Sequence, residues 1–163
     1  MLIGILSDTH SSLPKESKDF FKDCDEIWHA GDIGDIKILN ELQEIAPTYA
    51  VYGNIDDSQI KQTTSEELFF QREGVKIYIK HIIGHPNKYQ KDILTKLTEY
   101  RPDLVIAGHS HILQIIYDKK NKWLFINPGA AGKYGFHQKI TLVKIKIENN
   151  KISNAQIFEK EKQ

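Results

Sequence analysis

The sequence predicts an α/β fold in which two mixed β-sheets pack face to face with helices on their outer sides, a four-layer α/β/β/α sandwich. Two observations predict this class. The first half of the chain alternates short apolar runs with amphipathic segments, whereas the last third contains strand-like runs separated by polar turns. At 163 residues the chain is long enough for a real core and is expected to form a single domain over residues 1–163.

The first half of the chain shows three strand-like runs joined by two helical segments. The apolar runs lie at residues 2–6, 26–29 and 48–52. Pro14 is suited to open a short helix that ends at Phe21, because proline is favoured at the first helical position. Asp35 can cap a second helix, and Pro47 would stop it. This alternation predicts a parallel sheet covered by helices.

The second half of the chain supplies the remaining strands and one further helix. The predicted strands lie at residues 67–71, 75–80, 104–107, 112–117, 123–127, 140–147 and 152–158. A helix is expected around residues 89–100, just before Pro102. Within residues 140–147 the apolar positions change phase after Leu142, and this change predicts a β-bulge.

The composition argues against several classes of function. Lys and Arg together number 22, as do Asp and Glu, so the formal net charge is zero and extended nucleic-acid binding is not expected. Cys24 is the only cysteine, which excludes an internal disulfide and a zinc site built on thiolates. No apolar run approaches the ~20 residues of a membrane span, so no membrane association and a cytoplasmic location are expected.

Short polar clusters follow several of the predicted strands and contain residues that can ligate metal. These clusters are Asp8-Thr9-His10, Gly31-Asp32, Gly53-Asn54 and Gly108-His109-Ser110-His111, with His81 directly after the strand at residues 75–80. Ligands of parallel α/β sheets collect at the carboxyl ends of the strands, so these side chains are expected to converge. Oxygen and imidazole donors without thiolate suit Mn, Fe, Zn or Ni. The clusters therefore predict metal-assisted hydrolysis at phosphorus.

The order D-x-H, G-D, G-N, an isolated His and G-H-x-H resembles the calcineurin-like metallophosphoesterase superfamily. The length and simple layout are most similar to its small single-domain phosphodiesterase branch, and the resemblance spans roughly residues 2 to 135. It implies one metal held by Asp8, His10 and His111, a second held by Asn54, His81 and His109, and Asp32 as the bridge between them. It also implies two divalent ions, manganese before iron, nickel or zinc, and a metal-bridging hydroxide that attacks phosphorus in line.

The chain departs from this family at two positions that bear on the chemistry. Many members carry a histidine directly after the asparagine, where it can protonate the leaving group, but this chain has Ile55. The branch usually shows His-Gly-His, whereas this chain reads His81-Ile82-Ile83-Gly84-His85. His81 is the expected ligand because it follows its strand directly, and His85 is the alternative. If His81 is the ligand, His85 could contact the substrate, act as the acid or be a free loop histidine, and Asn54 could also contact the substrate.

Three other functions remain as alternatives to a phosphodiesterase with a small substrate. A phosphomonoesterase would use the same site. A protein-binding scaffold, which would be similar to a retromer subunit of the superfamily, would not turn over phosphate. A metal-dependent nuclease lacks the basic surface that tracks a nucleic-acid backbone. A homodimer is compatible with all of these.

Several residues outside the expected ligand set have two possible roles. His29, inside a predicted strand, could support the metal site or simply fill the core. His137 could reach the pocket or a neighbouring subunit, or lie in an aromatic surface loop. Asp56 and Asp57 could form a polar turn or touch the second metal's surroundings. The Asn127-Pro128-Gly129 segment is expected to line the rim of the site through its backbone.

Overall fold

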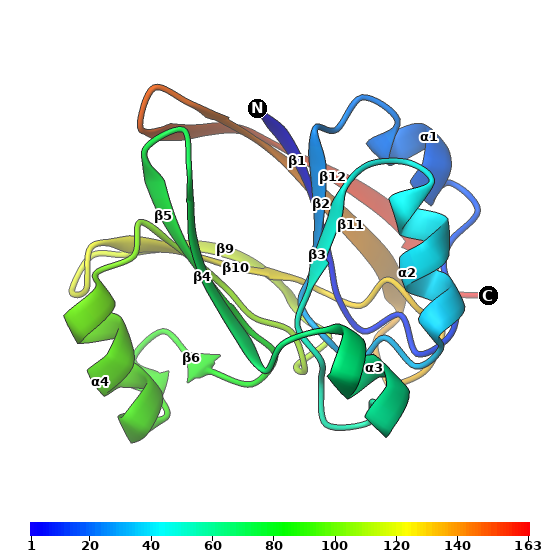
Figure 1. Cartoon of the computed structure of the whole chain (residues 1–163), viewed down its shortest axis with the longest axis horizontal. Coiled ribbons are helices and arrows are strands. Elements are labelled where there is room, and N and C mark those ends of the chain that lie inside the picture. The colour runs from blue at the N-terminus through cyan, green and yellow to red at the C-terminus, as the bar shows by residue number, and fades with distance from the viewer.

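The computed structural model describes all residues, 1–163, and contains two five-stranded sheets with helices outside them (Figure 1). The first sheet has the order β12-β11-β1-β2-β3, with bounds Lys151–Glu161, Lys139–Glu148, Leu2–Leu6, Glu26–His29 and Thr48–Ala50. The second has the order β4-β5-β8-β10-β9, with bounds Glu67–Arg72, Val75–Lys80, Leu104–Ile106, Trp123–Pro128 and Leu113–Asp118. A small hairpin joins β6 (Gly84–His85) to β7 (Lys88–Tyr89).

The helices lie on the outer sides of the two sheets and complete the predicted four layers. In Figure 1, α1 (Ser17–Phe21) and α2 (Ile36–Gln43) flank the first sheet, and α4 (Lys91–Tyr100) flanks the second. The short α3 (Ser58–Thr63) lies below the first sheet. No helix is both long enough and apolar enough to cross a membrane. The α/β/β/α sandwich expected from the sequence is confirmed.

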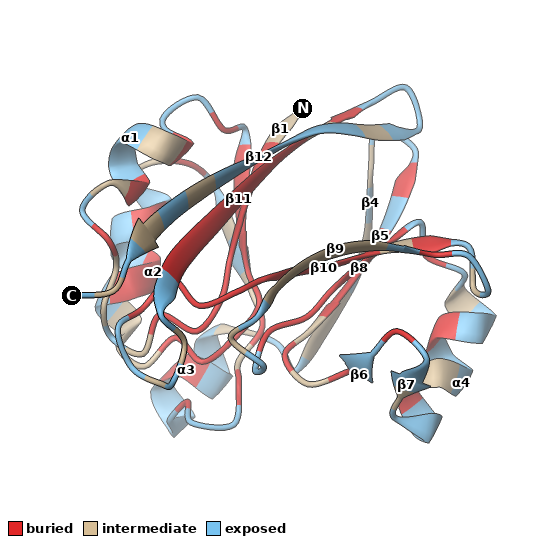
Figure 2. Ribbon diagram, turned by 180° about the vertical axis from the view of Figure 1, so that it is seen from behind, coloured by how far each residue is buried: buried red, intermediate tan, exposed pale blue.

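Three hydrophobic clusters fill the spaces between these layers. A cluster of 14 buried residues, among them Ile5, Ile77 and Val143, lies between the two sheets. A cluster of 12, which includes Leu6 and Leu39, lies between the first sheet and its helices, and a third of 8 lies between α4 and the second sheet. Figure 2 shows the inner strand β11 buried along most of its length and its edge neighbour β12 largely exposed. One core per interface is what a four-layer arrangement requires.

The strand directions place all five candidate ligand loops at one end of the sandwich. Strands β1, β2 and β3 run parallel in the first sheet, and β8 runs parallel to β5 and β10 in the second. The loops that follow β1, β2, β3, β5 and β8 therefore leave at carboxyl ends. This is the edge at which parallel sheets collect ligands.

The predicted bulge occurs, but on a different strand from the one expected. Leu142 belongs to the helix-side cluster and Val143 to the cluster between the sheets, because β11 is covered on both faces. The phase change along β11 thus needs no bulge. The register instead shifts where Lys144 pairs with Gln156 and Lys146 with Ser153, so that the extra residue lies on β12.

Three short elements differ from those predicted from the sequence. The first helix begins at Ser17 rather than at Pro14. Helix α3 has one buried apolar residue, Ile60, and begins where the Asp57 side chain accepts a hydrogen bond from the Ile60 N–H at 3.0 Å. The hairpin of β6 and β7 includes Tyr89, which the sequence placed in a helix. Elements of two to six residues give no periodic signal, so these differences follow from their length.

Candidate metal centre

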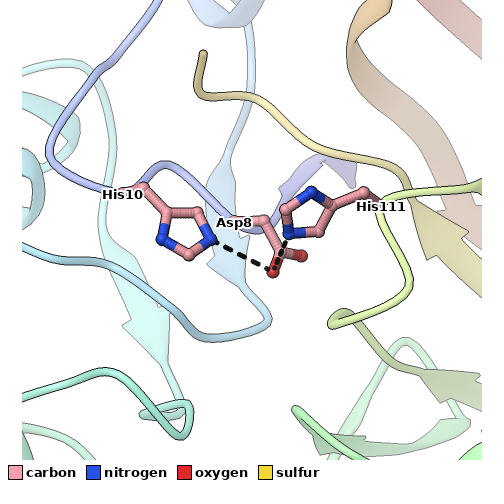
Figure 3. A group of neighbouring side chains, drawn as sticks. All are labelled: Asp8, His10 and His111. Carbon is pink, nitrogen blue, oxygen red and sulfur yellow. Dashed lines mark ion pairs between the residues drawn. The ribbon is translucent and has the colours of Figure 1, made fainter. Parts of the chain in front are cut away.

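The loops at the carboxyl ends bring six of the expected ligand residues into two compact groups. Ligand atoms of Asp8, His10 and His111 lie within 4.8 Å of one another, as do those of Asp32, His81 and His109. Figure 3 shows the first group, in which His10 and His111 point their rings at the Asp8 carboxylate. The Asp8 Oδ1 atom lies 3.1 Å from His111 Nε2 and 3.8 Å from His10 Nε2.

Asp32 faces both groups at once. Its Oδ1 atom lies 3.3 Å from His81 Nε2, and its Oδ2 atom lies 3.6 Å from His10 Nε2. Burial alone would raise the pKa of the Asp32 carboxyl, but His81 and the other polar neighbours outweigh burial and hold that pKa below its usual range. Asp32 is thus an ionised carboxylate with one oxygen turned toward each group.

Three buried polar atoms at the centre of the two groups have no hydrogen-bond partner. These atoms are Asp8 Oδ1, His10 Nε2 and His81 Nε2. A buried polar atom without a partner costs about 1–3 kcal/mol, so three of them converging on one place require an explanation. Carboxylate oxygens and imidazole nitrogens are ligands for borderline divalent cations, and the geometry fits such ions.

The buried ring of His81 is held so that one nitrogen is free to coordinate. Its Nδ1 atom lies 2.7 Å from the carbonyl oxygen of Ala30, which only accepts, so Nδ1 carries the proton. The lone pair of Nε2 then points toward Asp32. Burial opposes protonation of His81, but Asp32 and Asp8 outweigh it and raise the pKa of the ring.

His137 orients His111 through a second chain of hydrogen bonds. The His137 Nε2 atom donates to the Gly132 carbonyl oxygen at 2.9 Å, so its Nδ1 atom is an acceptor. That acceptor lies 3.1 Å from the Nδ1 atom of His111, which must therefore carry the proton. The Nε2 lone pair of His111 is left facing Asp8. Of the roles considered for His137, the structure supports contact with the site.

His29 lies in the buried support beneath the site. Its Nδ1 atom accepts from the Gly31 N–H at 3.1 Å, so its Nε2 atom donates to Thr9 Oγ1 at 3.0 Å. The Thr9 hydroxyl in turn donates to the Ile33 carbonyl at 2.9 Å. Burial lowers the pKa of His29 to about 3, so the ring is neutral. His29 thereby joins the loop after β1 to the loop after β2.

Two further polar residues fix the loops, although only lesser roles were expected for them. The buried Asp56 carboxylate accepts backbone hydrogen bonds from Ile33, Gly34 and Gly53. The side chain of Asn127 donates to the Gly108 carbonyl and to Ser110 Oγ. Asp56 is therefore more than a polar turn, and Asn127 acts through its side chain rather than by lining a rim. The contacts of Asp56 with Ile33 and Gly34, and those of Asn127, join segments distant in sequence, so local patterns could not reveal them.

Five of the seven expected ligand residues have left-handed backbone conformations. Their φ angles are 54° for Asp8, 43° for His10, 55° for Asp32, 69° for His109 and 60° for His111. Such conformations are uncommon outside glycine and cost about 1–3 kcal/mol each, although Asp and His tolerate them better than most residues. They turn the side chains inward at the ends of the strands. A Cβ at Gly53 would collide with Asp32, which explains the glycine before Asn54.

The remaining two candidate residues are Asn54 and His85. Asn54 is exposed and lines a pocket of about 190 Å³ with His81 and Lys61. His85 belongs to neither group of ligand atoms; its Nδ1 atom contacts the Pro86 carbonyl at 2.6 Å and its Nε2 atom faces Gln114 at 3.0 Å. The geometry favours His81 over His85 as a ligand. Substrate contact by His85 or Asn54 stays a prediction.

Comparison with known proteins gives similarities over most of the chain. The model of the calcineurin-like phosphoesterase superfamily domain matches residues 1–150. A probable metallophosphoesterase of Methanothermobacter thermautotrophicus is 33% identical over 135 residues, which cover 80% of this chain and 77% of that protein. A phosphodiesterase of Methanocaldococcus jannaschii is 29% identical over 150 residues, which cover 82% of this chain and 86% of that protein.

Solved structures share the fold at low sequence identity. The crystal structure of wild-type Vps29 from Entamoeba histolytica complexed with zinc has a TM-score of 0.78 at 17% identity, and the match covers 100% of both chains. At this identity the likeness concerns the fold alone.

Proposed function

This chain belongs to the calcineurin-like phosphoesterase superfamily, and we propose that it is a phosphodiesterase for a small substrate with manganese as its resident ion. Membership makes it a metal-dependent phosphoester hydrolase. The observation that carries the proposal is the pair of ligand groups around Asp32, with three buried donor atoms aimed between them. The likeness to a named phosphodiesterase supports diester over monoester substrates.

The proposed ligands divide into two sets that share one carboxylate. Asp8, His10 and His111 would hold one ion, while Asn54, His81 and His109 would hold the other. Asp32 would bridge the two ions, a role supported by its two oxygens facing different groups. Two divalent ions would bring four positive charges, whereas the carboxylates of Asp8 and Asp32 bring two negative charges. The loaded site would therefore carry a net positive charge and attract a phosphate anion.

The chain's own residues would bind and orient the reacting groups. Bound divalent ions supply Lewis acidity and an activated water for in-line attack at phosphorus. Asp32 would link the two ligand groups, and His81 and His111 keep their Nε2 lone pairs inward through hydrogen bonds at Nδ1. The exposed Asn54 would contact the second ion or the incoming phosphate. Ile55 offers no proton to the leaving group, which favours esters whose leaving groups depart unaided.

A metal-reconstitution assay tests the proposal. The protein is treated with a chelator and then supplied with Mn, Ni, Zn or Mg, and hydrolysis of bis(4-nitrophenyl) phosphate is compared with that of 4-nitrophenyl phosphate. We expect diester turnover only with added metal, and highest with Mn. Faster turnover of the monoester would make the chain a phosphomonoesterase, and no turnover with any ion would refute an enzymatic function.

A cytoplasmic location is part of the proposal, supported by the single free cysteine, Cys24.

Restoring a general acid is expected to widen the range of leaving groups. In Ile55→His, the imidazole would stand where family members carry their acid, and kcat/KM for an alkyl diester should rise by about tenfold or more. An aryl diester, whose leaving group needs no proton, should change little. Ile55 is 46% exposed, so stability should be preserved.

A matched control separates this effect from the mere addition of an imidazole. Ile157 is 48% exposed on β12, away from the candidate ligand loops, and Ile157→His should alter neither substrate. An equal gain in both variants, or no gain for the alkyl diester in Ile55→His, would contradict a missing acid as the limit on the rate.

Removing the acceptor behind His111 is expected to weaken metal binding. His137→Ala should lower the affinity for one of the two ions by about 10–100-fold, the usual effect of losing a partner that orients a ligand. His137→Asn keeps a side-chain acceptor near the same place and should lose less. Titration of the metal against a chromophoric chelator measures both affinities. Equal affinities in wild type and His137→Ala would show that the contact has no orienting role.

A further inference from the structure

An apolar pocket lies directly beside the candidate metal centre. It has a volume of about 470 Å³ and shares His109 and His111 with the two ligand groups. Ile112, Tyr134 and Phe136 supply its apolar walls. Pockets of this size accommodate small-molecule groups. The pocket therefore opens onto the place where phosphorus would react.

Folding does not explain why these three apolar side chains face water together. The exposed fractions are 60% for Ile112, 71% for Tyr134 and 106% for Phe136. Single exposed apolar residues are ordinary, but three around one hollow beside a reactive centre indicate a binding surface. The Tyr134 ring lies 5.1 Å from the ring of His10, so one side of it is in contact with the first ligand group.

The loop that carries the two aromatic residues is held in place at several points. The His137 ring binds the Gly132 carbonyl at 2.9 Å, and the Lys162 ammonium binds the Gly135 carbonyl at 2.5 Å. Gly135 has a φ of 118° and packs so closely on the His111 ring that a side chain there would collide with it. The backbone of the loop is thus held in place and the Tyr134 ring lies beside His10, so ligand binding would have to order mainly the fully exposed Phe136 side chain.

We propose that this pocket binds a planar aromatic group of the phosphodiester, of which a nucleobase is the common biological form. The inference rests on the proposed phosphodiesterase function and names its substrate class. Two aromatic side chains offer faces on which a base can stack, and the Ser110 hydroxyl offers a partner for its polar edge. The phosphate of the same molecule would lie at the metal centre through the shared residues His109 and His111.

Binding of two ligands that differ only in the ring tests this inference without requiring turnover. Calorimetric titration of the manganese-loaded protein would compare adenosine 5′-monophosphate with ribose 5-phosphate, with inorganic phosphate as the reference. We expect the nucleotide to bind at least about tenfold more tightly than the sugar phosphate, the usual scale of one stacked base. Equal affinities for the two would overturn the pocket assignment while leaving the proposed function intact.

Variants assign the preference to named side chains. Tyr134→Ala combined with Phe136→Ala should remove the tenfold preference and leave ribose 5-phosphate affinity unchanged, whereas Tyr134→Phe should keep it. Tyr117→Ala removes a tyrosine that is 58% exposed and does not line this pocket, and it should change neither affinity. A preference that survives in the double variant would overturn the assignment.

Two further outcomes distinguish the ways in which the inference can fail. If none of the three ligands binds, inorganic phosphate included, and no diester is hydrolysed, the proposed function fails and the pocket assignment with it. If Phe136→Ala converts a dimer to a monomer in sedimentation velocity and leaves the nucleotide preference untouched, the apolar face is an interface between copies of this chain. Either result would overturn the substrate class named here.

Discussion

Replacing Asp32 with asparagine should lower kcat/KM by about 10²–10³-fold, the effect of removing one preorganised charged group from an active site. The substitution keeps the shape of the side chain but removes the charge that faces both ligand groups. It also replaces one oxygen by an amide, which cannot coordinate as a carboxylate oxygen does. Steady-state hydrolysis of an aryl diester in the presence of manganese measures the loss.

The same chemical change at a helix cap provides the matched control. Asp35 caps α2 by accepting a hydrogen bond from the Lys37 N–H at 2.9 Å, and asparagine caps helices about as well as aspartate. Asp35→Asn should therefore retain full activity and stability. Near-normal turnover in Asp32→Asn would refute the assignment of Asp32 as the bridge and, with it, the two-ion arrangement.

Removing metal should abolish turnover and also lower the thermal stability of the fold. Ions that bind the folded chain alone stabilise it by ~2.7 kcal/mol at a concentration 100 times the Kd. For a domain of this size that corresponds to a Tm difference of roughly 5–11 °C. They would also provide partners for the buried Asp8, His10 and His81 atoms that have none. Differential scanning fluorimetry with chelator and with added manganese measures the difference.

The Asp32→Asn variant tests whether this stabilisation arises at the proposed site. Its Tm should rise much less on addition of manganese than the Tm of wild type, because the shared ligand is weakened. Magnesium, which prefers oxygen ligands and keeps its waters, should stabilise the wild type less than manganese. An equal rise in wild type and Asp32→Asn would show that the ions bind elsewhere.

The sequence was sufficient for the architecture and for which residues come together at the candidate centre, because both depend on strands. Apolar runs identified the strands, and their carboxyl ends identified where Asp8, Asp32 and His109 would meet. The choice of His81 over His85 rested on the same argument and agrees with the observed geometry. Each of these inferences needed only local pattern and the rule that parallel strands collect ligands at one edge.

The support around the ligands could not be predicted in the same way. The contact of His137 with His111 spans 26 positions, and Asp56 binds backbone amides more than 20 positions away. No residue pattern specifies a hydrogen bond between segments brought together only by tertiary packing. The bulge was predicted on β11 but lies on β12 for a related reason. Because both faces of β11 are buried, its apolar residues change from one face to the other without a bulge.

The two ligand groups each draw on both halves of the sandwich. In the first group, Asp8 and His10 follow a strand of the first sheet, whereas His111 follows a strand of the second. In the second group, Asp32 follows a strand of the first sheet and His81 follows a strand of the second. Metal coordination would therefore cross-link the two sheets at the end of the sandwich that carries the ligand loops. Any breathing motion that spreads the halves apart at this end must break metal–ligand bonds, so catalytic competence and mechanical integrity would be lost in a single event.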